Sequence, residues 1–112
     1  MRHEQLYLTD ILEAADSISG FLAGLSEEGF LGSDLLRSAV LHKLTVIGEA
    51  AARLPVDFVQ RHPDIPWADI VGLRNIAVHA YFAVKWSIVW VAGTEEVPRL
   101  RGQVEAILKG QS

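Results

Sequence analysis

The chain has 112 residues, of which half are hydrophobic, and it carries a formal net charge of −4 and no cysteine. This length predicts a single domain, residues 1–112, and the absence of cysteine excludes disulfides, thiolate metal sites and a cysteine nucleophile. The acidic balance argues against a nonspecific nucleic-acid binder, which normally has a basic face, whereas the high apolar content indicates that some surface is buried against a partner.

The first half of the chain predicts two long amphipathic helices. From Gln5 to Leu25, apolar residues recur at the spacing of one helical face. The second helix begins at Ser33 or Asp34, either of which could cap it, and runs to about Leu54. Between the two helices, residues 26–29 predict a break. The expected buried stripes are Leu8, Ile11, Leu12, Ala15, Ile18, Leu22 and Leu25, then Leu36, Val40, Leu44, Ile47, Ala51 and Leu54.

Gly48 stands near the middle of the second predicted helix, where glycine costs roughly 1 kcal/mol relative to alanine. A close helix crossing would explain why that cost is tolerated. Glu49 follows, and two interpretations stay open: a solvated surface charge, or an acid that orients Arg74 or lines the same cleft. His42 lies on a different face from the buried stripe and is expected at the surface or in a dimer contact.

The middle of the chain predicts shorter helices bounded by prolines. One short helical piece lies between Pro55 and Pro63. A third main helix opens at Pro66, since proline suits the first turn of a helix. This helix carries Arg74 and delivers His79 at or near its end.

The last third predicts a helix over residues 86–96, a kink or restart at Pro98, and a final helical segment over 99–108. Trp86 and Trp90 are four apart and share a face, so core packing is favoured over a base-stacking platform, which would need basic neighbours. No strand-like alternation competes with this pattern. The fold class is therefore expected to be all-α, an antiparallel bundle of four or five helices.

The richest chemistry lies in one stretch of eight residues that contains Arg74, Asn75, His79 and Tyr81. Arginine is a permanent cation whose fork matches two phosphate oxygens, and histidine both takes and gives a proton near neutral pH. On an unbroken helix, positions five apart differ by about 140°, so Arg74 and His79 would not share a face. Either the helix ends near His79, or a second copy of the chain completes the site.

Other kinds of site lack support in the sequence. The four histidines, at positions 3, 42, 62 and 79, show no paired metal-binding spacing, so we expect neither a metal nor a cofactor. There is no phosphate-cradling glycine loop and no serine in a nucleophile elbow. Polar residues interrupt every apolar segment and no signal peptide is visible, so we expect no membrane association and a cytoplasmic location.

The pattern Arg74-x-x-x-x-His79-x-Tyr81 resembles the signature of HepT-type toxins, which belong to the HEPN superfamily of helical ribonucleases. The likeness covers most of the chain, in matching order and spacing. Its further segments are Ile47–Ala51, Pro66–Trp67, Ile70–Asn75, Tyr81–Phe82 and Ile88–Trp90.

The resemblance implies a metal-independent endoribonuclease that acts on RNA, with tRNA among the candidates, as the toxin of a toxin–antitoxin pair. It implies a homodimer whose two motifs face one cleft. The implied partner is MntA, a minimal nucleotidyltransferase that transfers AMP to the motif tyrosine, here Tyr81. In this scheme His79 is general base or general acid, Arg74 holds the phosphate, and Asn75 orients Arg74 or the phosphate. Tyr81 contacts the substrate as well as being the modified residue, and Glu49 supports the site.

Two other functions stay open. The chain could be a non-catalytic helical dimer that binds a nucleotidyltransferase, or a structural bundle with no chemistry. The chain departs from the family pattern in three places: Ala80 stands where glycine is frequent, Ile76 stands where a polar or basic residue is frequent, and Lys85 stands where an acidic residue is common. The lysine either adds positive charge near the cleft or removes a helix-capping carboxylate.

Overall fold

The computed structural model describes residues 2–76 and 85–110, and every regular element assigned within them is helical. This confirms the predicted all-α class for the described part of the chain. Because residues 77–84 are not described, the predicted number of helices stays untested. The elements in chain order are α1 (Arg2–Leu22), α2 (Glu27–Leu31), α3 (Asp34–Ala52), α4 (Val56–Arg61), α5 (Trp67–Gly72), a 3₁₀ turn η1 (Leu73–Asn75), α7 (Trp86–Val91), a π-helical turn η3 (Ala92–Glu96) and α8 (Val97–Gly110).

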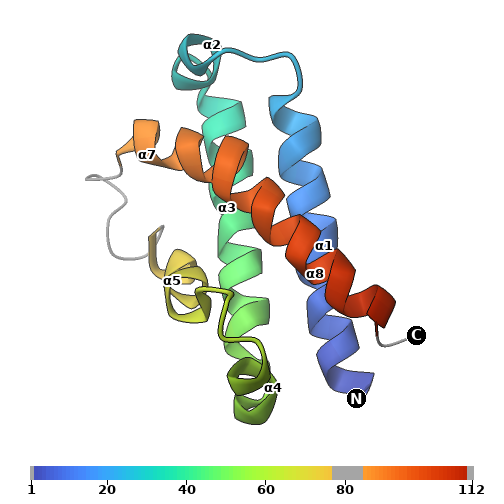
Figure 1. Cartoon of the computed structure of the whole chain (residues 1–112). Coiled ribbons are helices and arrows are strands. Elements are labelled where there is room, and N and C mark those ends of the chain that lie inside the picture. The colour runs from blue at the N-terminus through green and yellow to red at the C-terminus, as the bar shows by residue number, and fades with distance from the viewer. Residues whose placement is uncertain (1, 77–84, 111–112) are drawn as a thin grey trace.

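Three long helices enclose the core. Helices α1 and α3 run antiparallel and α8 crosses in front of them, while α2 lies at one end of the pair and α4 at the other (Figure 1). The predicted stripes are confirmed, because the apolar positions at helical spacing turn inward on each long helix. The buried members are Leu8, Ile11, Ala15, Ile18 and Leu22 on α1, Val40, Leu44, Ile47 and Ala51 on α3 with Leu54 just after it, and Leu100 and Val104 on α8.

Helix α2 is a correction to the sequence analysis, which expected only a break over residues 26–29. The break is short: Ser26 caps a new helix, its hydroxyl accepting a hydrogen bond of 3.0 Å from the backbone N–H of Gly29. Five residues are too few to show a helical period. The helix places Phe30 in the core, with ring centroids 6.4 Å and 5.5 Å from Trp86 and Trp90.

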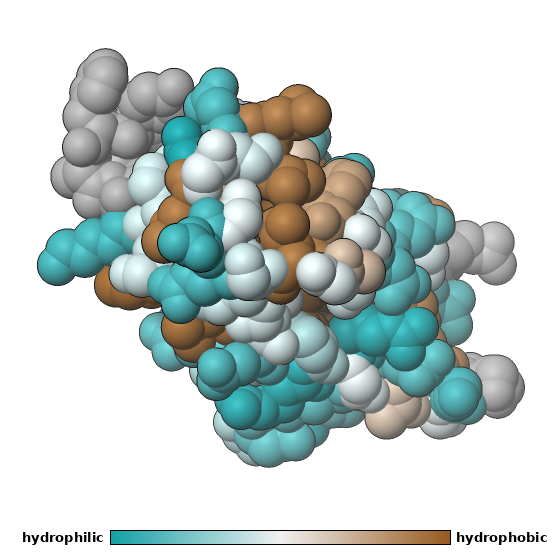
Figure 2. All heavy atoms as spheres, turned by 90° about the horizontal axis from the view of Figure 1, so that it is seen from above, coloured by the Kyte–Doolittle hydropathy of each residue, from teal (hydrophilic) through white to brown (hydrophobic). Residues whose placement is uncertain are grey.

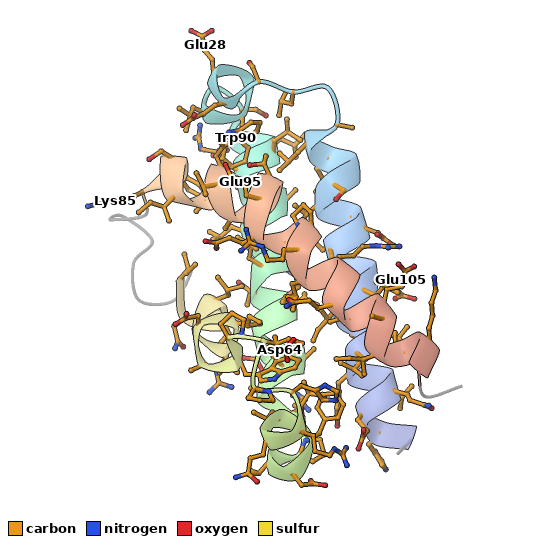
Figure 3. The ribbon with its side chains drawn as sticks, viewed as in Figure 1. Glu28, Asp64, Lys85, Trp90, Glu95 and Glu105 are labelled. Carbon is orange, nitrogen blue, oxygen red and sulfur yellow. The ribbon has the colours of Figure 1, made fainter. Side chains whose placement is uncertain are left out.

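These aromatic contacts confirm that the two tryptophans are packing residues. Both are half-buried against the core, and Figure 3 shows Trp90 between α2 and the α7 end of the bundle. The guanidinium of Arg37 lies over the ring of Trp86, 5.4 Å from its centroid. The alternative of a base-stacking platform is not favoured, because Phe30 packs against both tryptophans and Arg37 covers a face of Trp86.

The kink or restart predicted at Pro98 takes the form of a change of helix type just before the proline, since α8 begins at Val97 directly after the π-helical turn η3. Proline has no N–H to donate and its ring clashes with the carbonyl four residues earlier, here that of Thr94. The chain accommodates it with the wider turn η3, in which the N–H of Val97 bonds the carbonyl of Ala92, five residues back. The irregularity therefore lies before the proline, and α7, η3 and α8 form one continuous helical path (Figure 1).

Polar contacts fasten the outer helices to α1. Arg101 on α8 donates to Asp16 at 2.9 Å and pairs with Glu105 at 2.9 Å, and these carboxylates raise the pKa of the guanidinium above its ordinary value. Arg61 on α4 pairs at 3.6 Å with Glu4, which is buried. Among residues 2–76 and 85–110, no helix has both the length and the apolar character that crossing a membrane requires.

The end of the molecule formed by α2 carries hydrophobic side chains at its surface, which Figure 2 shows among polar ones. The elements at this end supply Leu31 on α2 and Leu35 at the start of α3. Nearby α7 adds Ile88 and Val91. Leu35 and Ile88 are 78% and 62% exposed, so this end supplies part of the apolar surface that the composition predicted.

Candidate functional site

The segment that carries Arg74 is anchored by aromatic packing below it. Helix α5 begins directly after Pro66, and the indole N–H of Trp67 donates to the carbonyl of His62 at 3.0 Å. The Trp67 ring also lies 6.0 Å from the fully buried ring of Phe58. The start of α5 is thereby held on α4, and the chain reaches Arg74 two turns later.

The predicted third main helix is not continuous, and this is a correction. Helix α5 ends at Gly72, and Leu73, Arg74 and Asn75 form the tighter turn η1. A 3₁₀ turn has three residues per turn, so its neighbouring side chains point about 120° apart. Arg74 and Asn75 therefore leave the backbone in different directions, Arg74 half-buried and Asn75 exposed.

Gly48 explains how η1 lies so close to α3. A Cβ built on Gly48 would stand 2.5 Å from the backbone nitrogen of Arg74, 3.0 Å from its Cβ and 3.1 Å from the carbonyl oxygen of Ile70. Only a residue without a side chain permits this approach. The close crossing expected from the sequence is confirmed, and the backbone that crosses at Gly48 is that of Arg74.

Glu49 lies on the exposed face of α3, one residue after this crossing. Its carboxylate borders a shallow groove between α1 and α3 that also includes Tyr7, His42 and Arg53. Arg74 and Glu49 form no ion pair with each other or with any other described residue. The supporting role of Glu49 therefore stays a prediction, as does the dimer contact of His42.

His79 and Tyr81 lie in residues 77–84, outside the described part of the chain. The structure thus places Arg74 and Asn75 on η1 beside Gly48, with Glu49 one residue further along α3 in the groove towards α1, and leaves His79 and Tyr81 to the sequence. Within the described ranges, no group of three histidine, aspartate or glutamate side chains is arranged to hold a metal ion.

A second feature near Arg74 was missed by sequence reasoning. A half-open cavity of about 390 Å³ adjoins η1, and Leu73 is one of its walls. Its lining comes from the α4–α5 connection, α5, η1, η3 and α8. No local pattern indicates such a cavity, because its walls belong to segments far apart in the sequence, α5 and η1 on one side and η3 and α8 on the other.

Comparisons with known proteins agree with the resemblance. The family model of HepT-like ribonucleases matches residues 11–107. "Probable ribonuclease HepT" of Thermococcus cleftensis is 37% identical over 108 residues, which cover 96% of this chain and 98% of that protein.

Two further relatives carry provisional RNase names. A Methanocaldococcus jannaschii protein is 35% identical over 95% of this chain and 97% of its own length. A Caldanaerobacter subterraneus protein is 35% identical over 97% of each. No solved structure matches the chain significantly. The chain belongs to the HepT-like ribonuclease family.

Proposed function

We propose that this protein is a metal-independent endoribonuclease and the toxin of a toxin–antitoxin pair. The observation that carries the proposal is the placement of Arg74, the motif arginine of a HepT-like chain, on a tight turn held against Gly48. A cation with a fixed backbone is suited to holding a phosphate, because the electrostatic stabilisation needs no reorganisation during reaction.

The reaction that fits these residues is an internal transfer at phosphorus. His79 takes the proton of a ribose 2′-hydroxyl, and the 2′-oxygen attacks the adjacent phosphorus. The bond from phosphorus to the 5′-oxygen breaks, and that oxygen receives a proton from the His79 of a second subunit. Arg74 stabilises the charge on the non-bridging oxygens, Asn75 orients Arg74 or the phosphate, and the product ends in a 2′,3′-cyclic phosphate.

The direct test uses purified protein free of any partner, with RNA and a chelator in place of divalent cations. We expect cleavage that leaves a 2′,3′-cyclic phosphate. His79→Ala and Arg74→Ala should each lower the rate by about 100-fold or more, the scale of a lost acid–base or phosphate-stabilising group. Arg99→Ala is the matched control, because Arg99 is an exposed arginine on α8, outside the motif and outside the groove that contains Glu49. Equal activity of His79→Ala and the parent would refute the assignment.

The proposed switch is AMP transfer to Tyr81 by an MntA-type nucleotidyltransferase. An AMP group on this tyrosine adds negative charge and bulk inside the proposed cleft, which opposes RNA binding by the same rules as phosphorylation. On co-expression with such an enzyme, the intact mass of the chain should rise by whole AMP units. Tyr81→Phe should abolish the increase. An unchanged mass of the parent chain would contradict the switch.

The net charge of −4 favours one alternative, a non-catalytic dimer that binds a nucleotidyltransferase. Under this alternative the purified chain leaves RNA intact, while the mass increase on co-expression persists. The two experiments together therefore separate the toxin from the binding module.

A further inference from the structure

The cavity behind η1 has the form of a binding site that the proposed nuclease chemistry does not use. Its volume, about 390 Å³, lies within the range of ligand pockets, roughly 300–1,000 Å³. Apolar side chains from both sides make its walls: Ile70 and Leu73 come from α5 and η1, and Ala92, Val97 and Leu100 from η3 and α8. Such walls suit an apolar group.

The rim of the cavity is acidic. Asp64, Asp69 and Glu96 border it and are exposed, and Arg99 is the one basic residue in its lining, which gives three negative charges against one positive. None of the four forms an ion pair with another described residue. Figure 3 shows Asp64 on the connection between α4 and α5. The carboxylates therefore come from both sides of the opening, since Glu96 belongs to η3.

Charge complementarity decides the kind of occupant. The acidic rim repels the phosphates of RNA, so the cavity is a poor site for the substrate of the proposed nuclease. A second copy of the chain is a poor fit as the occupant, because its ten basic residues are scattered along the sequence. The two that lie closest in sequence are already in use: Arg99 lines this cavity, and Arg101 pairs with Asp16 and Glu105.

We infer that the cavity is a docking site for a basic segment of a partner protein, which inserts one apolar side chain between α5 and α8 while its lysines or arginines meet Asp64, Asp69 and Glu96. The site adjoins η1 directly, because Leu73 is a wall of the cavity and the next residue, Arg74, packs against Gly48. An occupant that moves Leu73 displaces the backbone of Arg74. This last consequence rests on the proposed function, whereas the docking itself does not.

The test selects random dodecapeptides displayed on phage against the folded chain, without RNA. We expect enriched peptides to carry an apolar residue flanked by lysine or arginine, and to bind more weakly as salt is raised. The double variant Asp69→Lys with Glu96→Lys should weaken binding by about tenfold or more.

The matched control is Asp57→Lys with Glu95→Lys. Asp57 and Asp69 are both acidic residues in the first turn of a short helix, and Glu95 adjoins Glu96 without lining the cavity. The control pair should leave peptide affinity within a factor of about two. If circular dichroism shows that the Asp69→Lys, Glu96→Lys variant does not fold, Asp69→Asn and Glu96→Gln replace it. Each of these single variants is expected to lose peptide affinity severalfold.

Three outcomes would overturn the inference. Repeated selection that enriches no peptide over an unrelated protein is one, and enrichment of neutral or acidic peptides is another. Equal weakening by the control and cavity pairs is the third. Since none of these measurements uses RNA cleavage, failure of the nuclease proposal and failure of the docking site are distinguishable.

Discussion

At the residue scale, Gly48 does the most to position the proposed chemistry. Mid-helix glycine is normally a cost, and here the close approach of the Arg74 backbone gives the reason for it. Arg74 is thus placed by main-chain contact with α3. The position of its backbone therefore does not depend on a partner for the guanidinium.

Replacing Gly48 by alanine tests this role, because alanine favours the helix but would collide with the Arg74 backbone. The added Cβ would lie 2.5 Å from the Arg74 nitrogen, a backbone atom that cannot rotate away. We expect Gly48→Ala to lower the free energy of unfolding by about 1–3 kcal/mol, the cost of overpacking a core, and to lower RNA cleavage. Urea denaturation measures the first effect and a cleavage assay the second.

Gly102→Ala is the control for that experiment. Gly102 lies inside α8, and a Cβ there would meet nothing within 4 Å. This change should stabilise the protein by roughly 0.5–1 kcal/mol, because alanine is the better helix former. Stabilisation by both substitutions would show that the α3–η1 crossing is looser than described.

At the element scale, the helices differ in how they begin. Ser26 and Ser33 cap α2 and α3, each hydroxyl accepting from a backbone N–H at 3.0 Å and 3.1 Å. Helix α7 begins after Lys85, whose side chain makes no capping hydrogen bond. Figure 3 shows Lys85 extending away from the bundle. The expectation that this lysine replaces a capping carboxylate agrees with its position.

Lys85→Asp should therefore stabilise the fold by about 1 kcal/mol, because a carboxylate at the N-cap accepts a free N–H and interacts favourably with the helix dipole. Thermal unfolding monitored by circular dichroism measures the effect. Lys85→Ala, which removes the charge without adding an acceptor, should show much less of it. Ser33→Ala should move the midpoint in the opposite direction. A lower midpoint for Lys85→Asp than for Lys85→Ala would contradict the capping account.

At the scale of the whole molecule, the open question is whether one subunit or two build the site. The chain is acidic overall, and Arg74 stands without an ion-pair partner among the described residues. Two copies that face one another would bring two such cations to one RNA strand. Hydrophobic side chains exposed at the α2 end, including Leu35, leave surface that a partner could cover (Figure 2).

Mixing the parent with an inactive variant tests the shared site. The proposed mechanism uses the His79 of both subunits, so a mixed dimer of one parent subunit and one His79→Ala subunit should be inactive. Equal amounts refolded together, with random pairing, should therefore show about a quarter of the activity that the same number of parent dimers shows. The parent refolded alone is the control and should recover full activity. Retention of about half of the activity in the mixture would show that each His79 works within its own subunit.

The helical stripes could be predicted because they depend on local order alone. Leu8, Ile11 and Ile18 recur with the helical period and are buried in the structure. Two features escaped prediction for physical reasons. Helix α2 has five residues, too few to show a helical period. The π-helical turn η3 lies before Pro98, and its position depends on which backbone carbonyls can go without a hydrogen bond from the proline nitrogen.

By itself, the sequence determined the all-helical class, the inward faces of the long helices, the family, and the identity of Arg74, His79 and Tyr81 as candidates for the chemistry. These follow from residue type and spacing along the chain. Only the tertiary structure decided that the third helix tightens into η1, that the Arg74 backbone lies on Gly48, and that an acid-rimmed cavity opens behind Leu73. The reason is that each of these features joins elements distant in sequence, and their packing is set by the shapes of all the side chains between them.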